Sequence, residues 1–410
     1  MNILHINNTD LPGSRFNGHD LQIDLNKAGH KAYQLVAEKL GNDSNTICFI
    51  DSRFFVNRQS YINFEKRLSM HGLIYPYGRK IMSMPQFQQA DVVHYHLIHN
   101  YIISLFDYKE MVSVKPSVWT IHDPWALTGH CIYPMDCEKW KTGCHTCPYL
   151  DTNFPMQHDK ASQMWKIKKT VYSELDVDIV VASKYMLDLV KQSPLMSSFE
   201  RIHLIPFGIK LEKFTLKKSK KEIKKEFGIP EDHFVITFRA DRSKFKGLPY
   251  IIEMLKRLNP SKPITLLTVG QKGLLNNFKF KFNVIDYDWI TDDNLMAKIY
   301  HACDVFLMPS TAEAFGLMAI EAMASSRPIV VFDGTSLPDV TFAPDCGIVV
   351  KQGDVAGLCE AVERLMANPE ECERRGTLGR QLVEKHYSYD QYFNKLLMLY
   401  EDVIKRKRSR

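Results

Sequence analysis

The sequence lacks a long apolar run and lacks the pattern of a secretory signal. No apolar stretch approaches the ~20 residues that a membrane-spanning helix needs. The opening residues, MNILHINN, have neither the basic stretch nor the long apolar core of a signal peptide, and they predict a first strand instead. We therefore expect a cytoplasmic chain. In that reducing compartment, nine cysteines do not imply a disulfide framework.

Two signatures of nucleotide and metal chemistry are also missing or weak. No Gly-x-Gly-x-x-Gly follows the first predicted strand, which disfavours a dinucleotide-dependent dehydrogenase. The metal-binding pattern Asp-x-Asp occurs as Asp176-Val-Asp178 and as Asp286-Tyr-Asp288. The first pair precedes a buried strand and the second has no glycine or apolar context, so we interpret both as loop caps. No metal or other cofactor is therefore expected for catalysis.

Charge of one sign is only slightly in excess, and the excess is local. The 410 residues carry 53 Lys and Arg against 47 Asp and Glu, a formal net charge of +6. Basic residues cluster at 217–225 (KKSKKEIKK) and in the final KRKRSR. Such runs are usually solvated faces, but they also suit peripheral contact with the anionic inner face of the cell membrane. Aromatic residues are not interleaved with them as base stacking requires, so we expect no nucleic-acid partner.

The most informative segment is 310–331, STAEAFGLMAIEAMASSRPIVV. A predicted buried strand precedes it, Glu313 lies on the following turn, and Gly316 allows the backbone to approach a ligand closely. A helix predicted from Leu317 directs its free N–H groups to the strand ends, and Glu321 lies on its second turn. A strand, a turn and a helix N-terminus hold an anion at the carboxyl edge of a parallel sheet. The two flanking carboxylates then predict a nucleotide-sugar site; the alternative is a surface helix with two solvated glutamates.

Glutamate, seven residues and glutamate, here EAFGLMAIE at 313–321 followed by AMASSRPIV, resembles the donor-site signature of glycosyltransferase family 4, a retaining family with the GT-B fold. The resemblance covers most of 233–351 and only patches before it. It implies an α/β protein of two Rossmann-like, doubly wound parallel-sheet domains that face a cleft. It also implies a catalytic role for Glu313 and donor binding by Phe315, Gly316, Leu317 and Glu321.

A basic loop follows the strand predicted at 233–239. Arg239 ends that strand and Lys246 precedes Gly247, and both side chains suit a clamp on a diphosphate. The resembling family has an Arg at the strand end and a Lys before Gly, which implies donor binding by Arg239 and Lys246. Because the spacing is slightly long, Arg242 is an alternative for the first role. A plain solvated basic loop is the other alternative.

A second glycine-bearing loop, DLPGSRFNG at 10–18, follows the first predicted strand. In the resembling family a Gly-rich loop at this place touches the acceptor or the diphosphate, which implies such roles for Asn17 and Gly18. Here Phe-Asn-Gly replaces the usual Gly-Gly-Ala. An ordinary strand-to-helix turn is the alternative.

A histidine ends the strand predicted at 117–122, where α/β sheets place ligands. This residue, His122, matches the family's histidine that contacts the transferred sugar, and the resemblance implies the same role here. We interpret Asp123 as a cap or an orienting partner rather than a nucleophile. His94 and His96 alternate along another predicted strand, and we interpret them as core histidines.

Four cysteines crowd into one short insert within 128–150, with five, six and two residues between them: Cys131, Cys137, Cys144 and Cys147. Thiolates at such spacing suggest a structural, tetrahedral zinc site, for which His130 and His145 are alternative ligands. A disulfide pair and free buried thiols remain the other interpretations. A subgroup of the family's polysaccharide enzymes resembles this run, where Thr-Gly-His-Cys follows His-Asp.

We expect three structural parts. The first, 1–206, is an acceptor-side Rossmann-like domain that carries the cysteine insert, and within it we expect a helix at 31–40 and the second strand at 45–50. The second, 207–386, is a nucleotide-sugar-binding Rossmann-like domain. The third, 387–410, is a terminal helix that crosses back to the first domain in the resembling fold.

The expected activity is retaining, metal-independent transfer of a sugar from a nucleotide-diphosphate sugar to a glycan or lipid-linked acceptor. Surface polysaccharide synthesis, such as capsule or O-antigen assembly, is the setting that the resemblance implies. A nucleotide-sugar epimerase of similar fold is the alternative enzyme. A non-catalytic binding protein that uses the cysteine insert and the lysine runs is the third hypothesis.

Overall fold

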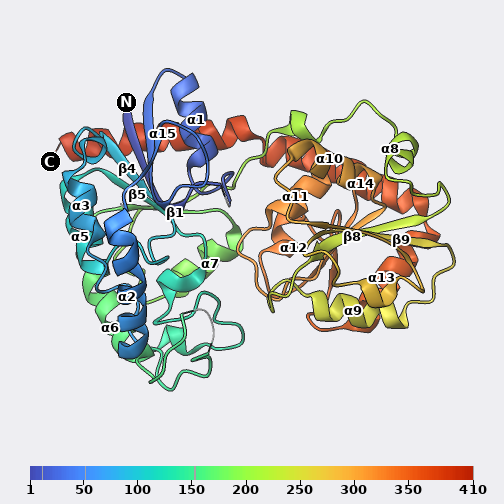
Figure 1. The fold of residues 1–410 in the computed structure, drawn as a ribbon, viewed down its shortest axis with the longest axis horizontal. Helices are drawn as coiled ribbons and strands as arrows, with labels where there is room; N and C mark the ends of the chain where they lie inside the picture. Colours follow the sequence, from blue (N-terminus) through green and yellow to red (C-terminus); the bar gives the residue numbers. More distant parts are fainter. Residues whose placement is uncertain (12, 51, 152–153, 410) are drawn as a thin grey trace. The chain divides into compact units, whose positions relative to one another are not determined.

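The computed structural model describes residues 1–11, 13–50, 52–151 and 154–409. It divides into two compact units, each built on its own parallel sheet (Figure 1). The N-terminal domain comprises Met1–Ile205 and Phe393–Arg410, and the C-terminal domain comprises Pro206–Tyr392. The expected α/β class with two doubly wound parallel sheets is confirmed.

The N-terminal sheet has seven parallel strands in the order β3-β2-β1-β4-β5-β6-β7. Its inner strands are buried on both faces because helices cover both sides of the sheet. The strands are β1 (Asn2–Thr9), β2 (Lys31–Glu38), β3 (Thr46–Cys48), β4 (Val92–Tyr95), β5 (Ser117–Thr120), β6 (Asp178–Val181) and β7 (Ile202–Leu204).

The helices of this domain connect successive strands, and α3, α5 and α6 pack against one another in that order (Figure 1). They are α1 (His19–Lys27), α2 (Ser52–Leu68), α3 (Tyr77–Ser83), α4 (Pro85–Gln88), α5 (Leu105–Val114), α6 (Ala161–Tyr172) and α7 (Lys184–Gln192), with short 3-10 turns η1 (Pro124–Leu127) and η2 (Lys139–Lys141).

The prediction of a helix at 31–40 is wrong. The segment forms β2, which pairs with β1 from Asn2↔Lys31 to Thr9↔Glu38, so the strand expected at 45–50 is the third and not the second. Residues of β2 are buried on both sides of the sheet. A strand that is covered on both faces has no clear alternation of apolar and polar residues, and in a short segment its pattern resembles that of a helix.

The C-terminal sheet has six parallel strands in the order β10-β9-β8-β11-β12-β13. Buried side chains of β8, β9, β11 and β12 pack against α9 and α13 in one continuous core. The strands are β8 (Phe234–Ala240), β9 (Ile264–Gly270), β10 (Asn283–Asp288), β11 (Val305–Met308), β12 (Ile329–Phe332) and β13 (Ile348–Val350).

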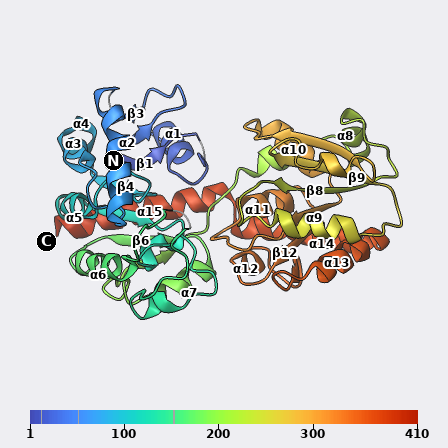
Figure 2. The same cartoon turned by 60° about the horizontal axis from the view of Figure 1, so that its bottom comes forward.

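Helices cover both faces of this sheet. Figure 1 shows α10, α11 and α14 on one face and α9 and α13 on the other, and Figure 2 gives a second view of the same layers. The helices are α8 (Lys220–Glu226), α9 (Leu248–Arg257), α10 (Asp293–Ala302), α11 (Leu317–Ala324), α12 (Leu337–Val340), α13 (Val355–Ala367) and α14 (Pro369–His386), with 3-10 turns η3 (Leu211–Phe214) and η4 (Asn276–Phe278).

The last helix, α15 (Tyr389–Arg408), begins in the C-terminal domain, and its residues from Phe393 onward belong to the N-terminal domain. There the Tyr400 hydroxyl lies 2.6 Å from Nδ1 of His94. None of the helices that the structure describes combines the length and apolar character needed to cross a bilayer.

Both basic runs make ion pairs within the protein. Arg406 donates to the Asp178 carboxylate at 2.8 Å, and Lys407 donates to the carbonyl of Ser113 at 3.1 Å. Lysines of the 217–225 run pair with acids of their own domain: Lys218 with Glu226, Lys220 with Asp304, and Lys221 with Glu231. Binding to an anionic membrane stays a prediction.

Candidate active site

In each sheet the strand order reverses once, and doubly wound proteins bind ligands outside the carboxyl ends of the strands at that point. The reversal lies between β1 and β4 in the N-terminal sheet, and between β8 and β11 in the C-terminal sheet. The predicted site residues of each domain follow these strands or the strand beside them. The two sites are described separately because each belongs to its own domain.

In the C-terminal domain, the loop after β11 leads directly into α11. Gly316 caps this helix with φ 99°, a left-handed conformation that favours glycine. A Cβ on Gly316 would lie 2.5 Å from Cδ2 of Leu337, so the backbone is closely packed here as well. The first N–H groups of α11, beginning at Leu317, have no partner within the helix and form a local positive end.

The loops after β8 and β11 are tied together. The N–H of Thr311 donates to the carbonyl of Phe245 at 2.9 Å. A Cβ on Gly247 would lie 1.9 Å from the carbonyl oxygen of Pro309, and only glycine allows this approach. The two loops therefore hold a fixed position relative to each other.

This contact brings two of the predicted donor-site residues into an ion pair. Nζ of Lys246 donates to Oε2 of Glu313 at 2.8 Å. The side chains are 24% and 13% exposed, so the pair is partly screened but reachable. The sequence predicted the two roles separately. The structure places Lys246, predicted to bind the diphosphate, beside Glu313, predicted to bind the sugar.

Two polar groups near this pair are buried without hydrogen-bond partners among the described residues. They are Nε of Arg239 and Oγ of Ser310. The other end of the Arg239 guanidinium pairs with Asp241. Arg242, the alternative to Arg239, is exposed, and its backbone N–H lies 3.4 Å from Oε1 of Gln271.

Glu321 and Phe315 lie deeper than the sequence suggested. Glu321 is 3% exposed, and its Oε2 accepts a hydrogen bond from the Tyr300 hydroxyl at 2.9 Å. Phe315 packs edge-to-face against Phe207 and Tyr387, with ring centroids 5.2 and 5.7 Å away. The packing of Phe315 fixes the start of α11, and ribose binding by Glu321 stays a prediction.

In the N-terminal domain, Asn17 stabilises its own loop. Its amide donates to the carbonyls of Thr9 and Asp10 at 3.0 and 2.7 Å, and its Oδ1 accepts from the N–H of His19 at 3.0 Å. The side chain is completely buried. The structure therefore shows Asn17 shaping the loop at the start of α1, and a contact of this residue with the acceptor or the diphosphate stays a prediction.

Gly18 and His122 share one neighbour in this domain, His96. Gly18 has φ 93°, and a Cβ there would lie 2.7 Å from Nδ1 of His5 and 2.8 Å from Nε2 of His96. Nε2 of His122 lies 3.0 Å from Nδ1 of His96, and the His122 ring contacts that of Phe16 at 5.3 Å between centroids. The loop and His122, 104 positions apart in the sequence, thus both contact His96.

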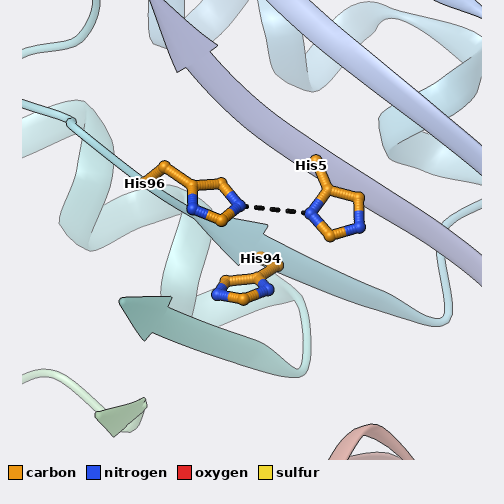
Figure 3. Close-up of side chains that lie close together, drawn as sticks. All are labelled: His5, His94 and His96. Carbon is orange, nitrogen blue, oxygen red and sulfur yellow. Dashed lines mark hydrogen bonds between the residues drawn. The ribbon is translucent and has the colours of Figure 1, made fainter. Parts of the chain in front are cut away.

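Sequence reasoning missed His5 and gave His94 and His96 only a core role. The pairing of β1 with β4 sets His5 directly beside His94, and Figure 3 shows the three rings together. Their ligand atoms all lie within 4.8 Å of one another. Burial lowers the pKa of His5 to about 3 and that of His122 to about 4, so these rings are neutral at pH 7.

The segment after His122 is held by a buried lysine that sequence reasoning also missed. Nζ of Lys168 donates to the carbonyls of Trp125 and Thr128 at 2.6 and 2.9 Å. Burial lowers the pKa of Lys168 to about 7. Asp123 caps η1 by accepting from the N–H of Trp125 at 2.9 Å, which confirms the interpretation of this residue as a cap.

The Asp-x-Asp pairs have other partners. Asp178 is buried and accepts from His203 at 2.7 Å and from Arg201 at 3.0 Å. Asp286 and Asp288 end β10 and accept from the backbone N–H groups of Gly273 and Lys272 at 2.6 and 3.0 Å. The second pair therefore caps a turn, as predicted, whereas Asp178 is a buried carboxylate that pairs with partly exposed basic side chains and is not a loop cap.

The four cysteines of the insert are free thiols in this structure. All nine cysteines are free, so the disulfide interpretation is not supported. Within the described residues, no three of the four insert sulfurs, those of Cys131, Cys137, Cys144 and Cys147, lie within 4.8 Å of one another. Burial raises the pKa of the Cys131 thiol to about 12, so this thiol is protonated at pH 7 in the metal-free protein. Structural zinc stays a prediction.

Comparison with known proteins supports the C-terminal site most directly. Residues 219–382 match the family described as glycosyl transferases group 1, a range that contains Arg239, Lys246 and both glutamates. The chain is a glycosyltransferase. Its two-domain fold is that of GT-B enzymes: a sucrose-phosphate synthase from Thermosynechococcus elongatus aligns with a TM-score of 0.71 over 98% of this chain and 99% of that one, at 17% identity.

Curated relatives of this glycosyltransferase include polysaccharide enzymes. It is 22% identical over 324 residues to the putative colanic acid biosynthesis glycosyl transferase WcaC of Escherichia coli, covering 73% of this chain and 76% of WcaC. It is 28% identical over 208 residues to the capsular polysaccharide biosynthesis glycosyltransferase CapM of Staphylococcus aureus, covering 48% of this chain and about half (53%) of CapM. The solved structure of WaaG, a glycosyltransferase involved in lipopolysaccharide biosynthesis, aligns with a TM-score of 0.67 over 96% of this chain and 98% of WaaG, at 15% identity.

Proposed function

We propose that this glycosyltransferase is a retaining, metal-independent enzyme of family 4. It moves a sugar from a nucleotide-diphosphate sugar to a glycan or lipid-linked acceptor in the synthesis of a surface polysaccharide. The observation that carries the proposal is the Lys246–Glu313 ion pair beside the N-terminus of α11. It combines a cation, an anion and free backbone N–H groups at the point where the C-terminal sheet reverses.

The diphosphate is the part of the donor that this site suits best. Lys246 and Arg239 offer positive charge, and the first N–H groups of α11 offer donors that need no side chain. Hydrogen bonds to a charged group contribute roughly 1.5–3 kcal/mol each, so a few of them stabilise a departing nucleoside diphosphate without a divalent ion. Anabaena HepE, a neighbour at 13% identity and a TM-score of 0.67, was solved with UDP and glucose.

Glu313 and His122 then act on the sugar. We assign to Glu313 the binding of sugar hydroxyls and the stabilisation of positive charge near the anomeric carbon. The acceptor oxygen attacks from the face that the diphosphate leaves and its proton passes to the departing phosphate oxygen, so configuration is retained without an enzyme nucleophile. To His122 we assign a hydrogen bond to the transferred sugar, as the resemblance implies, and to Glu321 the ribose.

The acceptor class rests on the curated relatives. WcaC and CapM are described as enzymes of colanic acid and capsular polysaccharide biosynthesis. A growing glycan or a lipid-linked sugar is the acceptor that fits such a role, and the resemblance of the cysteine insert to a polysaccharide subgroup points the same way.

A panel of nucleotide sugars tests the proposal. A true donor is expected to raise the melting temperature by mass action, and the same compound without an acceptor should be only slowly hydrolysed. Product analysis with donor alone separates the alternatives, because an epimerase would convert the donor to an isomeric nucleotide sugar. No melting shift with any nucleotide sugar or nucleoside diphosphate would contradict the proposal.

A further inference from the structure

We propose that His5 and His96 form a hydrogen-bonded imidazole chain that fixes the tautomer of His122, so that His122 meets its ligand as an Nδ1–H donor. His96 is then a positioning residue for the reaction. The ligand-facing role of His122 rests on the proposed function, whereas the chain itself rests on contacts within the N-terminal domain alone.

The chain has two links. Nδ1 of His5, on β1, lies 3.2 Å from Nε2 of His96, which follows β4 (Figure 3). Nδ1 of His96 lies 3.0 Å from Nε2 of His122, which follows β5. Each of these parallel strands thus contributes one ring: His5 from the middle of β1, His96 from just after β4 and His122 from just after β5. Both nitrogens of His96 are used, one toward each neighbour.

The direction of hydrogen-bond donation along the imidazole chain follows from its buried end, His5. Nε2 of His5 is buried and has no hydrogen-bond partner among the described residues. A neutral imidazole carries one N–H and one lone pair, so the position of the proton on His5 sets the positions on the next two rings. If Nε2 of His5 carried the proton, a donor would be buried without an acceptor. Buried N–H groups without an acceptor are rarer than acceptors without a donor.

The favoured arrangement therefore leaves a lone pair on Nε2 of His5. Nδ1–H of His5 donates to Nε2 of His96, and Nδ1–H of His96 donates to Nε2 of His122. His122 must then carry its own proton on Nδ1. Burial lowers the pKa of His96 well below its ordinary value and that of His122 to about 4, which keeps every ring of the chain in the neutral form that the argument requires.

His94 and Gly18 hold the chain in place from its sides. His94 stacks on His96 with 4.3 Å between centroids, and its two nitrogens lie 2.6 Å from the Tyr400 hydroxyl and 2.7 Å from Oγ1 of Thr120. Because both of its nitrogens are engaged and its ring is stacked, His94 does not direct a lone pair to a shared point with the other two. We therefore interpret the cluster as a hydrogen-bonded chain and not as a metal centre.

Nitrogen-15 NMR of histidine-labelled, full-length protein at pH 7 tests the tautomer without any donor. The His122 signals, assigned by their loss in His122→Asn, are expected to show a protonated Nδ1 and an unprotonated Nε2. An Nε2–H tautomer, or a rapidly exchanging mixture, would overturn the proposal. The result is independent of catalysis. If the protein transfers no sugar but His122 has a fixed Nδ1–H tautomer, the imidazole chain is supported and the proposed function is refuted.

Two substitutions of His96 form a matched pair. Asparagine places an amide N–H close to the position of Nδ1, whereas glutamine places its amide close to the position of Nε2. His96→Gln should therefore lose the link to His122, release its tautomer to a mixture and lower kcat about fivefold to tenfold, in line with the loss of one hydrogen bond. His96→Asn should retain the Nδ1–H signature and more of the rate. Equal loss of rate in both variants with an unchanged His122 tautomer would show that His96 has only a packing role.

Discussion

The two sheets carry neutral side chains in one domain and charged side chains in the other, at equivalent positions of the topology. Where the N-terminal sheet reverses its strand order, the side chains are neutral, buried imidazoles that bond to one another. Where the C-terminal sheet reverses, the site contains a partly buried ion pair, an arginine with one unpaired nitrogen and the N-terminus of a helix. The same topology thus serves a neutral, directional site in one domain and a charged site in the other. The difference teaches that the fold fixes the location of a site, and the residues at the strand ends fix its ligand.

The largest expected effect comes from a substitution in the charged site of the C-terminal domain. Glu313→Gln removes the negative charge near the anomeric carbon while it keeps the shape, and we expect kcat to fall by ~10²–10³, the range for loss of one preorganised electrostatic group. The measurement is sugar transfer from the donor that the melting panel identifies. Asp339→Asn, in α12 of the same domain, is the matched control and should leave kcat unchanged. Equal rates for wild type and Glu313→Gln would remove Glu313 from the mechanism.

The second prediction concerns the close backbone approach between the loops of the C-terminal site. Gly247→Ala puts a Cβ against the Pro309 carbonyl at φ 76°, whereas Gly228→Ala is strained in φ (66°) but meets no atom within 4 Å. We expect Gly247→Ala to lower the free energy of unfolding by roughly 1–3 kcal/mol more than Gly228→Ala, the usual cost of overpacking. Urea denaturation of both variants measures the difference, and equal stabilities would show that the loops are free to separate.

The third prediction concerns the neutral histidines of the N-terminal domain and is tested by the pH dependence of stability. Burial lowers the pKa of His5 from 6.5 to about 3, so between these values the unfolded chain binds a proton that the folded domain does not. Stability from this group is therefore complete above pH 6.5 and falls as the pH falls, by about 1 kcal/mol between pH 7 and pH 5.5. His5 faces His94, His96 and the Tyr400 hydroxyl, and none of these supplies a negative charge that would reverse the sign.

Tryptophan fluorescence follows this domain selectively, because four of the five tryptophans lie in it and only Trp289 lies in the other domain. Unfolding midpoints at pH 7 and pH 5.5 should differ less in His5→Phe than in the wild type. If the substitution leaves the pH dependence unchanged, His5 is not a neutral buried group.

These predictions rest on features that the sequence revealed to different degrees. Glu313, Gly316 and Glu321 lie within nine residues of one another, so their spacing carried the C-terminal site without a structure. The His5–His96 contact requires the register of two strands about ninety residues apart, and no local pattern encodes it. The burial of Glu321 could not be predicted either. The pattern of a helix shows which face a residue lies on, but not which other elements pack against that face.

The error at β2 and the open question of the cysteines have related causes. The β2 segment is buried on both faces, and pattern reasoning depends on a contrast between faces that a central strand does not have. The spacing of the insert cysteines suggested a shared centre, whereas among the described residues no three of their sulfurs lie within 4.8 Å of one another. Cysteine spacing in a long loop restricts geometry much less than the spacing of two glutamates on a short helix.

The smallest expected effect is that of metal removal. Because Lys246, Arg239 and the start of α11 supply the positive charge, we expect turnover to change less than about twofold after treatment with EDTA and gel filtration, since no metal would contribute to the barrier. Assays with added Mg²⁺ or Mn²⁺ are the control for incomplete removal. A loss of activity that either ion restores would contradict metal independence.

Calorimetric titration with UDP, and with GDP as the second probe, tests most directly whether the C-terminal strand ends form an anion site. Wild type, Lys246→Ala and Lys244→Ala should be compared, since Lys244 is an exposed cation on the same loop. We predict that Lys246→Ala weakens nucleotide binding about tenfold to a hundredfold, the loss of one charged hydrogen bond, and that Lys244→Ala binds as the wild type does. Equal affinities in all three proteins, or no binding of either nucleotide by the wild type, would contradict the account.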